Sequence, residues 1–141
     1  MDVRQRILVV DDEPNIRRSL VVRLENSGYR VDTAENGQEA LAFYQRALKE
    51  ASPYDLILLD LIMPGLDGLG ALDGIRQHEA SSGISQKDRT PVVMLTALSG
   101  SWEEDARYEG CDDYIQKPFK TETLMEIIHK RIRPPQSPGI G

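Results

Sequence analysis

The segment 54–65, YDLILLDLIMPG, contains the most apolar run of the chain, and that run ends in an acid. Residues 56–59 are four consecutive aliphatic residues, a pattern typical of a strand covered on both faces of a parallel sheet. Asp60 follows directly, and a Pro-Gly turn comes soon after. Burying an unpaired carboxylate is costly, so we expect Asp60 either to reach water or to meet a cation.

Four more short runs of this kind alternate with amphipathic stretches. The expected strands are 6–10, 30–34, 56–59, 92–95 and 113–115. Apolar residues at helical spacing predict helices after Pro14 and after Asn36, a weak glycine-containing helix over about 67–78, a fourth over 101–110 and a last over 124–132. The polar stretch 80–90 reads as a long loop. This alternation predicts an α/β fold, a doubly wound, five-stranded parallel sheet with helices on both faces.

Polar residues stand at the ends of four of the expected strands. They are Asp11 and Asp12 after the first, Asp60 after the third, Thr96 after the fourth, and Lys117 after the fifth. In a parallel sheet these ends meet at one edge, where such folds place their sites. Each residue taken alone is more often a cap or a turn, but the set is harder to attribute to coincidence.

Three clustered carboxylates repel one another, and a hard divalent cation such as Mg²⁺ relieves that repulsion. A carboxylate can also act as a nucleophile toward a phosphoryl group and form an acyl phosphate. Lys117 and the metal would then stabilise charge on the transferred group, and the Thr96 hydroxyl could hydrogen-bond one of its oxygens. The sequence therefore predicts that Asp60 is a phosphoacceptor beside a magnesium site.

Composition limits the other possibilities. The 141 residues, with 17 basic and 23 acidic side chains and a net charge of −6, fit one domain that does not bind nucleic acid directly. The longest apolar runs are far below the roughly 18 residues of a membrane span, and we expect no signal peptide. The one cysteine, Cys111, excludes an internal disulfide, fits a reducing cytoplasm and is expected to be a small buried residue.

Four motifs together resemble the receiver domain of two-component response regulators. They are ILVVDDEP, LILLDLIMPGLDG, VVMLTAL and DDYIQKPF, in the order and near the spacing of that family. The resemblance covers residues 6 to about 132. It implies a flavodoxin-like sheet with strand order 2-1-3-4-5. It also implies a receiver domain over 1–133, followed by a Pro/Gly-rich tail or linker over 134–141.

The resemblance also assigns roles residue by residue. Asp60 corresponds to the phosphoacceptor, and Asp11 and Asp12 to the acid pair that holds Mg²⁺, with Asp12 the direct ligand. The remaining matches are the carbonyl of Ile62 as a third metal ligand, Thr96 and Lys117 as contacts to the phosphoryl oxygens, Tyr114 as the aromatic switch residue, and Pro118, which in this family often follows a cis peptide bond.

A receiver of this family takes its phosphoryl group from a sensor histidine kinase or a phosphotransfer protein. It is a signalling domain, not a turnover enzyme. In the resemblance, Thr96 moves toward the phosphoryl group and Tyr114 turns inward, which changes the surface of the fourth helix, fifth strand and last helix. A downstream protein effector would bind that surface. A homodimer that forms on phosphorylation is a further possibility. The sequence does not identify the kinase, the effector or the pathway.

Two other functions compete with this reading. A phosphatase of the haloacid dehalogenase type also uses a nucleophilic aspartate, but it needs an acid two residues later, where this chain has Ile62. A pseudo-receiver would be an interaction scaffold of the same fold that takes no phosphate, although a scaffold has no need of the full polar set. Turnover of a phosphomonoester would favour the first alternative, and failure to form an acyl phosphate the second.

Some positions depart from the family or carry no assigned role. Ile62 and Leu98 stand where many relatives have polar side chains. Our hypothesis is that they leave an attacking water few hydrogen-bond partners, so that the acyl phosphate is long-lived and polar replacements speed its loss. Trp102 fits a partner contact and local packing equally well.

Overall fold

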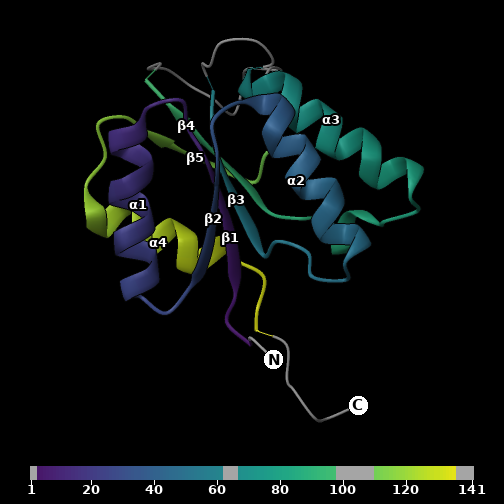
Figure 1. The fold of residues 1–141 in the computed structure, drawn as a ribbon, viewed down its shortest axis with the longest axis horizontal. Coiled ribbons are helices and arrows are strands. Elements are labelled where there is room, and N and C mark those ends of the chain that lie inside the picture. The colour runs from purple at the N-terminus through teal and green to yellow at the C-terminus, as the bar shows by residue number, and fades with distance from the viewer. Residues whose placement is uncertain (1–2, 62–66, 98–109, 136–141) are drawn as a thin grey trace.

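The computed structural model describes residues 3–61, 67–97 and 110–135 (Figure 1). The strands are β1 (Arg6–Val10), β2 (Arg30–Ala34), β3 (Leu56–Asp60), β4 (Val92–Thr96) and β5 (Asp113–Gln116). The helices are α1 (Pro14–Asn26), α2 (Gly37–Lys49), α3 (Gly68–Ser81) and α4 (Thr121–Arg131), with one 3-10 turn, η1 (Gln86–Asp88). The helix expected over 101–110 lies, except for its last residue, outside the described residues.

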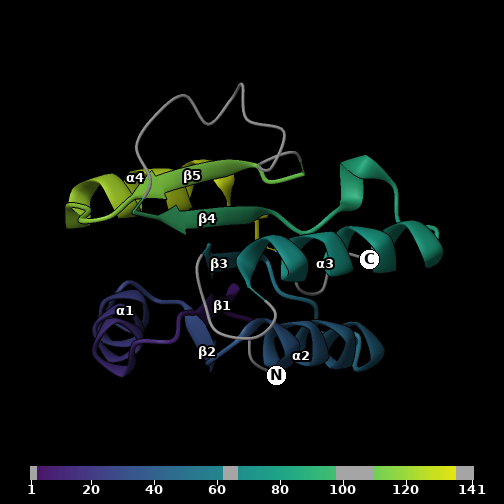
Figure 2. The same ribbon diagram turned by 90° about the horizontal axis from the view of Figure 1, so that it is seen from above.

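The five strands form one parallel sheet in the order β2-β1-β3-β4-β5, which confirms the expected topology. Helices α1 and α4 cover one face, and α2 and α3 cover the other (Figure 2). β1 lies between β2 and β3, so the chain changes direction across the sheet there. The carboxyl ends of β1 and β3 are therefore neighbours at that edge, where sites of such folds lie.

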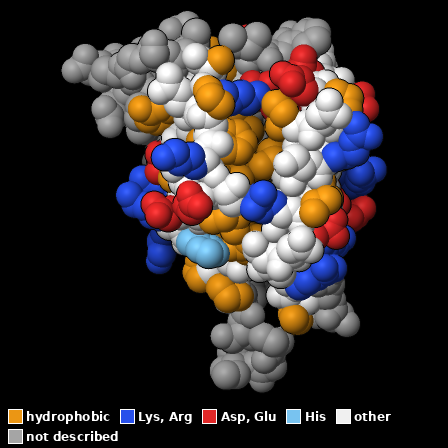
Figure 3. Space-filling model, turned by 90° about the vertical axis from the view of Figure 1, so that its left-hand side faces the viewer, with side chains coloured by type: hydrophobic (Ala, Val, Ile, Leu, Met, Phe, Trp, Pro, Cys, Tyr) orange, Lys and Arg blue, Asp and Glu red, His pale blue; other side chains and the backbone are white. Residues whose placement is uncertain are grey.

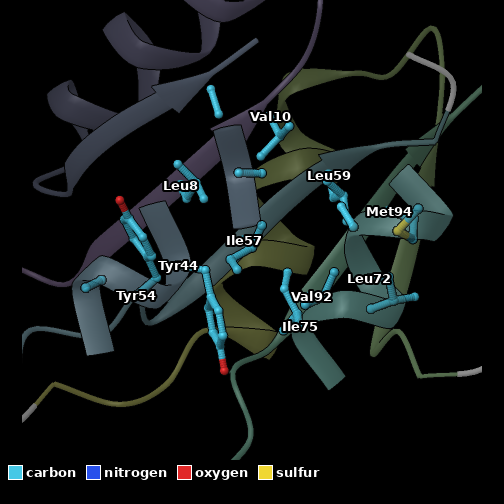
Figure 4. Close-up of a cluster of buried hydrophobic side chains, with 14 of the residues drawn as sticks. Leu8, Val10, Tyr44, Tyr54, Ile57, Leu59, Leu72, Ile75, Val92 and Met94 are labelled. Atoms are coloured by element: carbon cyan, nitrogen blue, oxygen red, sulfur yellow. The ribbon is translucent and has the colours of Figure 1, made fainter. Parts of the chain in front are cut away.

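Side chains that alternate along the strands pack into two separate hydrophobic cores, one on each face of the sheet. Leu8, Ile57 and Met94 pack with α2 and α3 in the core drawn in Figure 4. Their neighbours in sequence point to the opposite face and pack with Leu20 and Leu24 of α1 and with α4. All five residues of β3 and of β4 are buried, as expected for central strands covered on both faces.

Some hydrophobic side chains on the face made by α1 and α4 remain accessible to solvent, whereas the core beneath them is buried. Figure 3 shows hydrophobic side chains in a hollow on this face, with charged side chains around it. Partly buried side chains that pack on this core include Ile16 of α1 and Met125 of α4, while Val22 of α1 is 60% exposed. Within the described residues, no helix is both long and apolar enough to cross a membrane.

One element differs from its expected extent. The third helix was expected to end near His78 and a loop to fill 80–90, but α3 continues to Ser81 and η1 forms inside the loop. Two interactions account for the longer helix. Arg76 pairs with Glu79 one turn later at 2.8 Å, and Ser82 N–H donates back to the last turn before Gly83 adopts φ +73°.

Candidate functional site

Three carboxylates gather at the carboxyl-terminal edge of the sheet. Asp11 and Asp12 follow β1, Asp60 ends β3, and one oxygen from each lies within 4.8 Å of the others. Asp11 and Asp60 are buried, whereas Asp12 is exposed. The parallel pairing of β1 with β3 brings these acids together from positions about fifty residues apart in sequence.

Lys117 is the cation that Asp60 meets. Its Nζ lies 2.9 Å from Asp11 Oδ2 and 3.4 Å from Asp60 Oδ2. Burial by itself lowers the pKa of this ammonium, but hydrogen bonding and attraction from Asp11 and then Asp60 outweigh burial, so the pKa of Lys117 is raised. One lysine thus stays charged between two of the three carboxylates, and the cluster keeps a net negative charge.

Asp11 is fixed on every side. Its N–H donates to the Ala34 carbonyl of β2, and its Oδ1 accepts from the Glu13 N–H at 2.9 Å. Its own carbonyl oxygen accepts from Arg17 Nη1 at 2.7 Å. Sequence reasoning missed Arg17, because an arginine on an amphipathic helix carries no local signal that it bonds the main chain of a site residue.

The floor of the site depends on Gly68, the first residue of α3. A Cβ at this position would overlap the Asp60 carbonyl oxygen, and the Gly68 N–H donates to the Leu61 carbonyl at 3.0 Å. The glycine therefore lets the start of α3 approach the main chain next to Asp60. Asp67 caps this helix by accepting from the Gly70 N–H. Gly68, one of the glycines that weaken the helix signal in sequence, thus has a packing reason.

Thr96 and Tyr114 lie on adjacent strands, Thr96 at the carboxyl-terminal end of β4 and Tyr114 earlier along β5. Thr96 ends β4, is buried, and its carbonyl accepts from the Lys117 N–H at 2.6 Å. Tyr114 pairs in register with Met94, two residues before Thr96, so alternation places both side chains on one face of the sheet. Tyr114 is half-buried against the core on that face. The peptide bond before Pro118 is cis, which confirms that expectation.

The donors fit a hard divalent cation. They are carboxylate oxygens, the ligands that Mg²⁺ prefers, and one of the acids faces solvent where water could complete the coordination. Ile62, whose carbonyl was expected as a further ligand, lies outside the described residues. Leu98 and Trp102 lie outside them as well.

Cys111 lies on the other side of the molecule from these acids, just before β5. It is half-buried, so it is less covered than the buried residue that the sequence predicts. Burial, with the nearby Asp112 and Asp113 carboxylates, raises the pKa of its thiol to about 11. The thiol is therefore protonated at neutral pH and has no part in the site.

Comparison with known proteins agrees with this geometry. The family model described as the response regulator receiver domain matches residues 7–129. The transcriptional regulatory protein ResD of Bacillus subtilis is 47% identical over 129 residues, which are 91% of this chain and 48% of that protein. The DNA-binding response regulator MtrA of Mycolicibacterium smegmatis is matched over 52% of its length. The chain thus spans about half the length of these relatives.

Solved structures give the same result. The response regulator TrrA of Thermotoga maritima, in complex with Mg²⁺-BeF, superposes with a TM-score of 0.71 at 39% identity, covering 89% of this chain and 97% of that one. The receiver domain of Saccharomyces cerevisiae Ssk1, crystallised with the histidine phosphotransfer protein Ypd1, gives a TM-score of 0.78 at 28% identity, covering 93% and 90%. This chain therefore belongs to the response regulator receiver domain family of two-component systems.

Proposed function

We propose that this domain takes a phosphoryl group onto Asp60 from a histidine kinase or a phosphotransfer protein, with Mg²⁺ bound by the adjacent acids. The observation that carries the proposal is the position of Lys117 Nζ, 2.9 Å from Asp11 and 3.4 Å from Asp60, inside a cluster of three acids. The relatives support both halves of it: TrrA was solved with Mg²⁺-BeF, and Ssk1 was solved with a phosphotransfer protein.

The chain's own residues have distinct parts in this proposal. Asp60 supplies the attacking carboxylate oxygen, and the charged Lys117 ammonium faces the oxygens of the incoming group. Asp11 holds Lys117 in place through the 2.9 Å hydrogen bond. Asp12, on the exposed side, completes the oxygen ligands for Mg²⁺, which when bound neutralises charge on the phosphoryl oxygens. None of these residues is assigned to hydrolyse the acyl phosphate, so in this proposal the domain acts as a signalling acceptor.

The output would be a change in the surface near β5 and α4. Thr96 and Tyr114 share one face of the sheet on adjacent strands, so a phosphoryl group that draws the Thr96 hydroxyl leaves space toward which the Tyr114 ring can turn. We propose that a downstream protein binds the altered surface of β5 and α4, and that phosphorylation could also bring two copies of the chain together; the expected helix at 101–110, the other part of this surface in the resemblance, lies outside the described residues except for its last residue. A histidine kinase as donor and a single cysteine, which has no partner for an internal disulfide, also favour the cytoplasm.

A phosphodonor experiment separates this function from an interaction scaffold. The protein is incubated with acetyl phosphate and Mg²⁺, and intact mass and deuterium exchange of β5 and α4 are recorded, with Asp60→Asn as the matched control. We expect one added phosphoryl group and altered exchange in the wild type, and neither in the variant. Phosphate uptake without any exchange difference would contradict the switch. No uptake would favour the scaffold, and sustained turnover of a phosphomonoester would indicate a phosphatase.

A further inference from the structure

We propose that Arg17 is a positioning residue for the magnesium site, acting through the Asp11–Asp12 peptide. The inference rests on the proposed function, because it needs Mg²⁺ to bind at these acids. Arg17 would touch neither the metal nor the phosphoryl group. It would hold the main chain so that the Asp12 carboxylate faces Asp60.

Arg17 is built into its place on α1. Its side chain is 14% exposed, and Nη1 donates to the Asp11 carbonyl at 2.7 Å. Nη2 lies 3.6 Å from the Glu35 carboxylate, which belongs to the turn between β2 and α2. The planar guanidinium therefore lies between two loops at the sheet edge, hydrogen-bonded to the Asp11 carbonyl of one and at ion-pair distance from the exposed Glu35 of the other.

The bond to the Asp11 carbonyl controls the direction of Asp12. The N–H of Asp11 is tied to β2, and its carboxylate is tied to the Glu13 N–H and to Lys117. Its carbonyl belongs to the peptide that leads into Asp12, which lies past the end of β1 and is exposed. Without Arg17 this peptide can rotate, and the Asp12 carboxylate would spend less time facing Asp60.

The charge of Arg17 and its positioning role have opposite expected effects on Mg²⁺ affinity, so the two can be separated by experiment. Removing a positive side chain near three acids would strengthen Mg²⁺ binding by attraction. Removing Arg17 together with Glu35 leaves the net charge unchanged, so the pair of substitutions reports the positioning effect. Arg18 is the matched neighbour: it is exposed and donates to Asn15 within the same helix.

The test is Mg²⁺ titration by calorimetry of folded, full-length protein. We expect R17Q/E35Q to raise the Mg²⁺ dissociation constant about tenfold, the lower end of the effect when a residue that orients metal ligands is lost. R17Q alone should raise it less, because the lost repulsion offsets part of the loss. The charge-neutral control R18Q/E25Q should bind as the wild type does, because both residues are exposed on α1.

A second readout distinguishes positioning from general damage. With acetyl phosphate, R17Q/E35Q should need more Mg²⁺ for half-maximal phosphorylation yet reach the wild-type rate at saturation. Wild-type affinity in R17Q/E35Q, or a loss equalled by R18Q/E25Q, would overturn the inference. A saturating rate that falls while Mg²⁺ affinity is kept would also overturn it. Wild-type protein that binds no Mg²⁺ would instead overturn the proposed function.

Discussion

The two edges of the sheet both combine acidic and basic side chains, but in different proportions. At the carboxyl-terminal edge, three acids face one lysine, and two of those acids are buried. At the amino-terminal edge, a cluster that we call the Arg76 network matches two arginines with two acids. Its members are Arg76, Glu79, Arg89 and Asp112.

Most of the charged groups of the Arg76 network have several hydrogen-bond partners. Arg76 donates to the Glu79 and Asp112 carboxylates and also to the carbonyls of Thr90 and Gly110. The buried Glu79 also accepts from the Thr90 N–H, and Arg89 pairs with the other Asp112 oxygen. Such a network fixes the long 80–90 segment to the starts of β4 and β5. The comparison shows that matched charges hold structure, whereas unmatched acids remain available for a metal or a phosphoryl group.

The largest expected effect is on stability at the amino-terminal edge. Arg76→Met leaves the buried Glu79 carboxylate without its cation, so we expect the free energy of unfolding to fall by about 3 kcal/mol. Urea denaturation measures this. Arg23→Met, on the exposed side of α1, is the control and should change stability little. A native-like Arg76→Met variant would show that the network adds nothing to the fold.

Cys111 reports the electrostatics of the same edge. Its thiol pKa is raised to about 11 from 9.0, so the reactive thiolate is scarce at neutral pH. Because one pKa unit is a factor of ten, we expect alkylation by iodoacetamide at pH 8 about a hundredfold slower than in an unfolded control. The rate should rise with pH up to about 11. Rapid alkylation of folded protein at pH 8 would be inconsistent with this environment.

At the carboxyl-terminal edge, removing an acid should cost binding and not stability. In Asp12→Asn we expect Mg²⁺ affinity to fall by about tenfold or more, because a charged oxygen ligand is lost. The free energy of unfolding should stay the same or rise, because repulsion from Asp11 and Asp60 is relieved. Calorimetry and urea denaturation on one preparation measure both. A large loss of stability would place Asp12 with the structural acids.

The smallest expected effect concerns Asp32 of β2, a carboxylate that is paired within the fold and lies outside the acid cluster. Burial raises the pKa of this carboxyl, but hydrogen bonds from Arg6 and Tyr54 outweigh burial, so the pKa is lowered. A lowered pKa stabilises the fold above the unfolded value of 3.8 and loses that contribution as pH falls. Asp32→Asn should therefore cost about 1 kcal/mol at pH 7 and less at pH 3, by thermal unfolding. An equal cost at both pH values would contradict the pKa shift.

Much of the fold could be predicted from the sequence, because the signals are local. Continuous aliphatic runs mark β3 and β4, and the structure extends each by only one residue, to Asp60 and Thr96. The meeting of Asp11, Asp60 and Lys117 followed from parallel topology, which sends strand ends to one edge.

The remainder depends on side chains that are distant in sequence. Arg76 reaches Asp112 across 36 positions, and Arg17 bonds a carbonyl, which leaves no pattern in the sequence. The predicted end of α3 was wrong for the same reason. The stretch after His78 was assigned to a loop from its polarity alone. Glu79 there is polar yet buried, and its partners come from α3 and from Thr90.

Locating the phosphate tests the central claim most directly. The protein is incubated with acetyl phosphate, with Mg²⁺ in one sample and EDTA in the other, and the modified residue is located by peptide mass spectrometry. We expect one phosphoryl group, on Asp60, that forms in Mg²⁺ and is largely absent in EDTA. Phosphate on another residue, or equal uptake in EDTA, would contradict the claim that the unmatched acids at this edge form a magnesium-assisted phosphoacceptor.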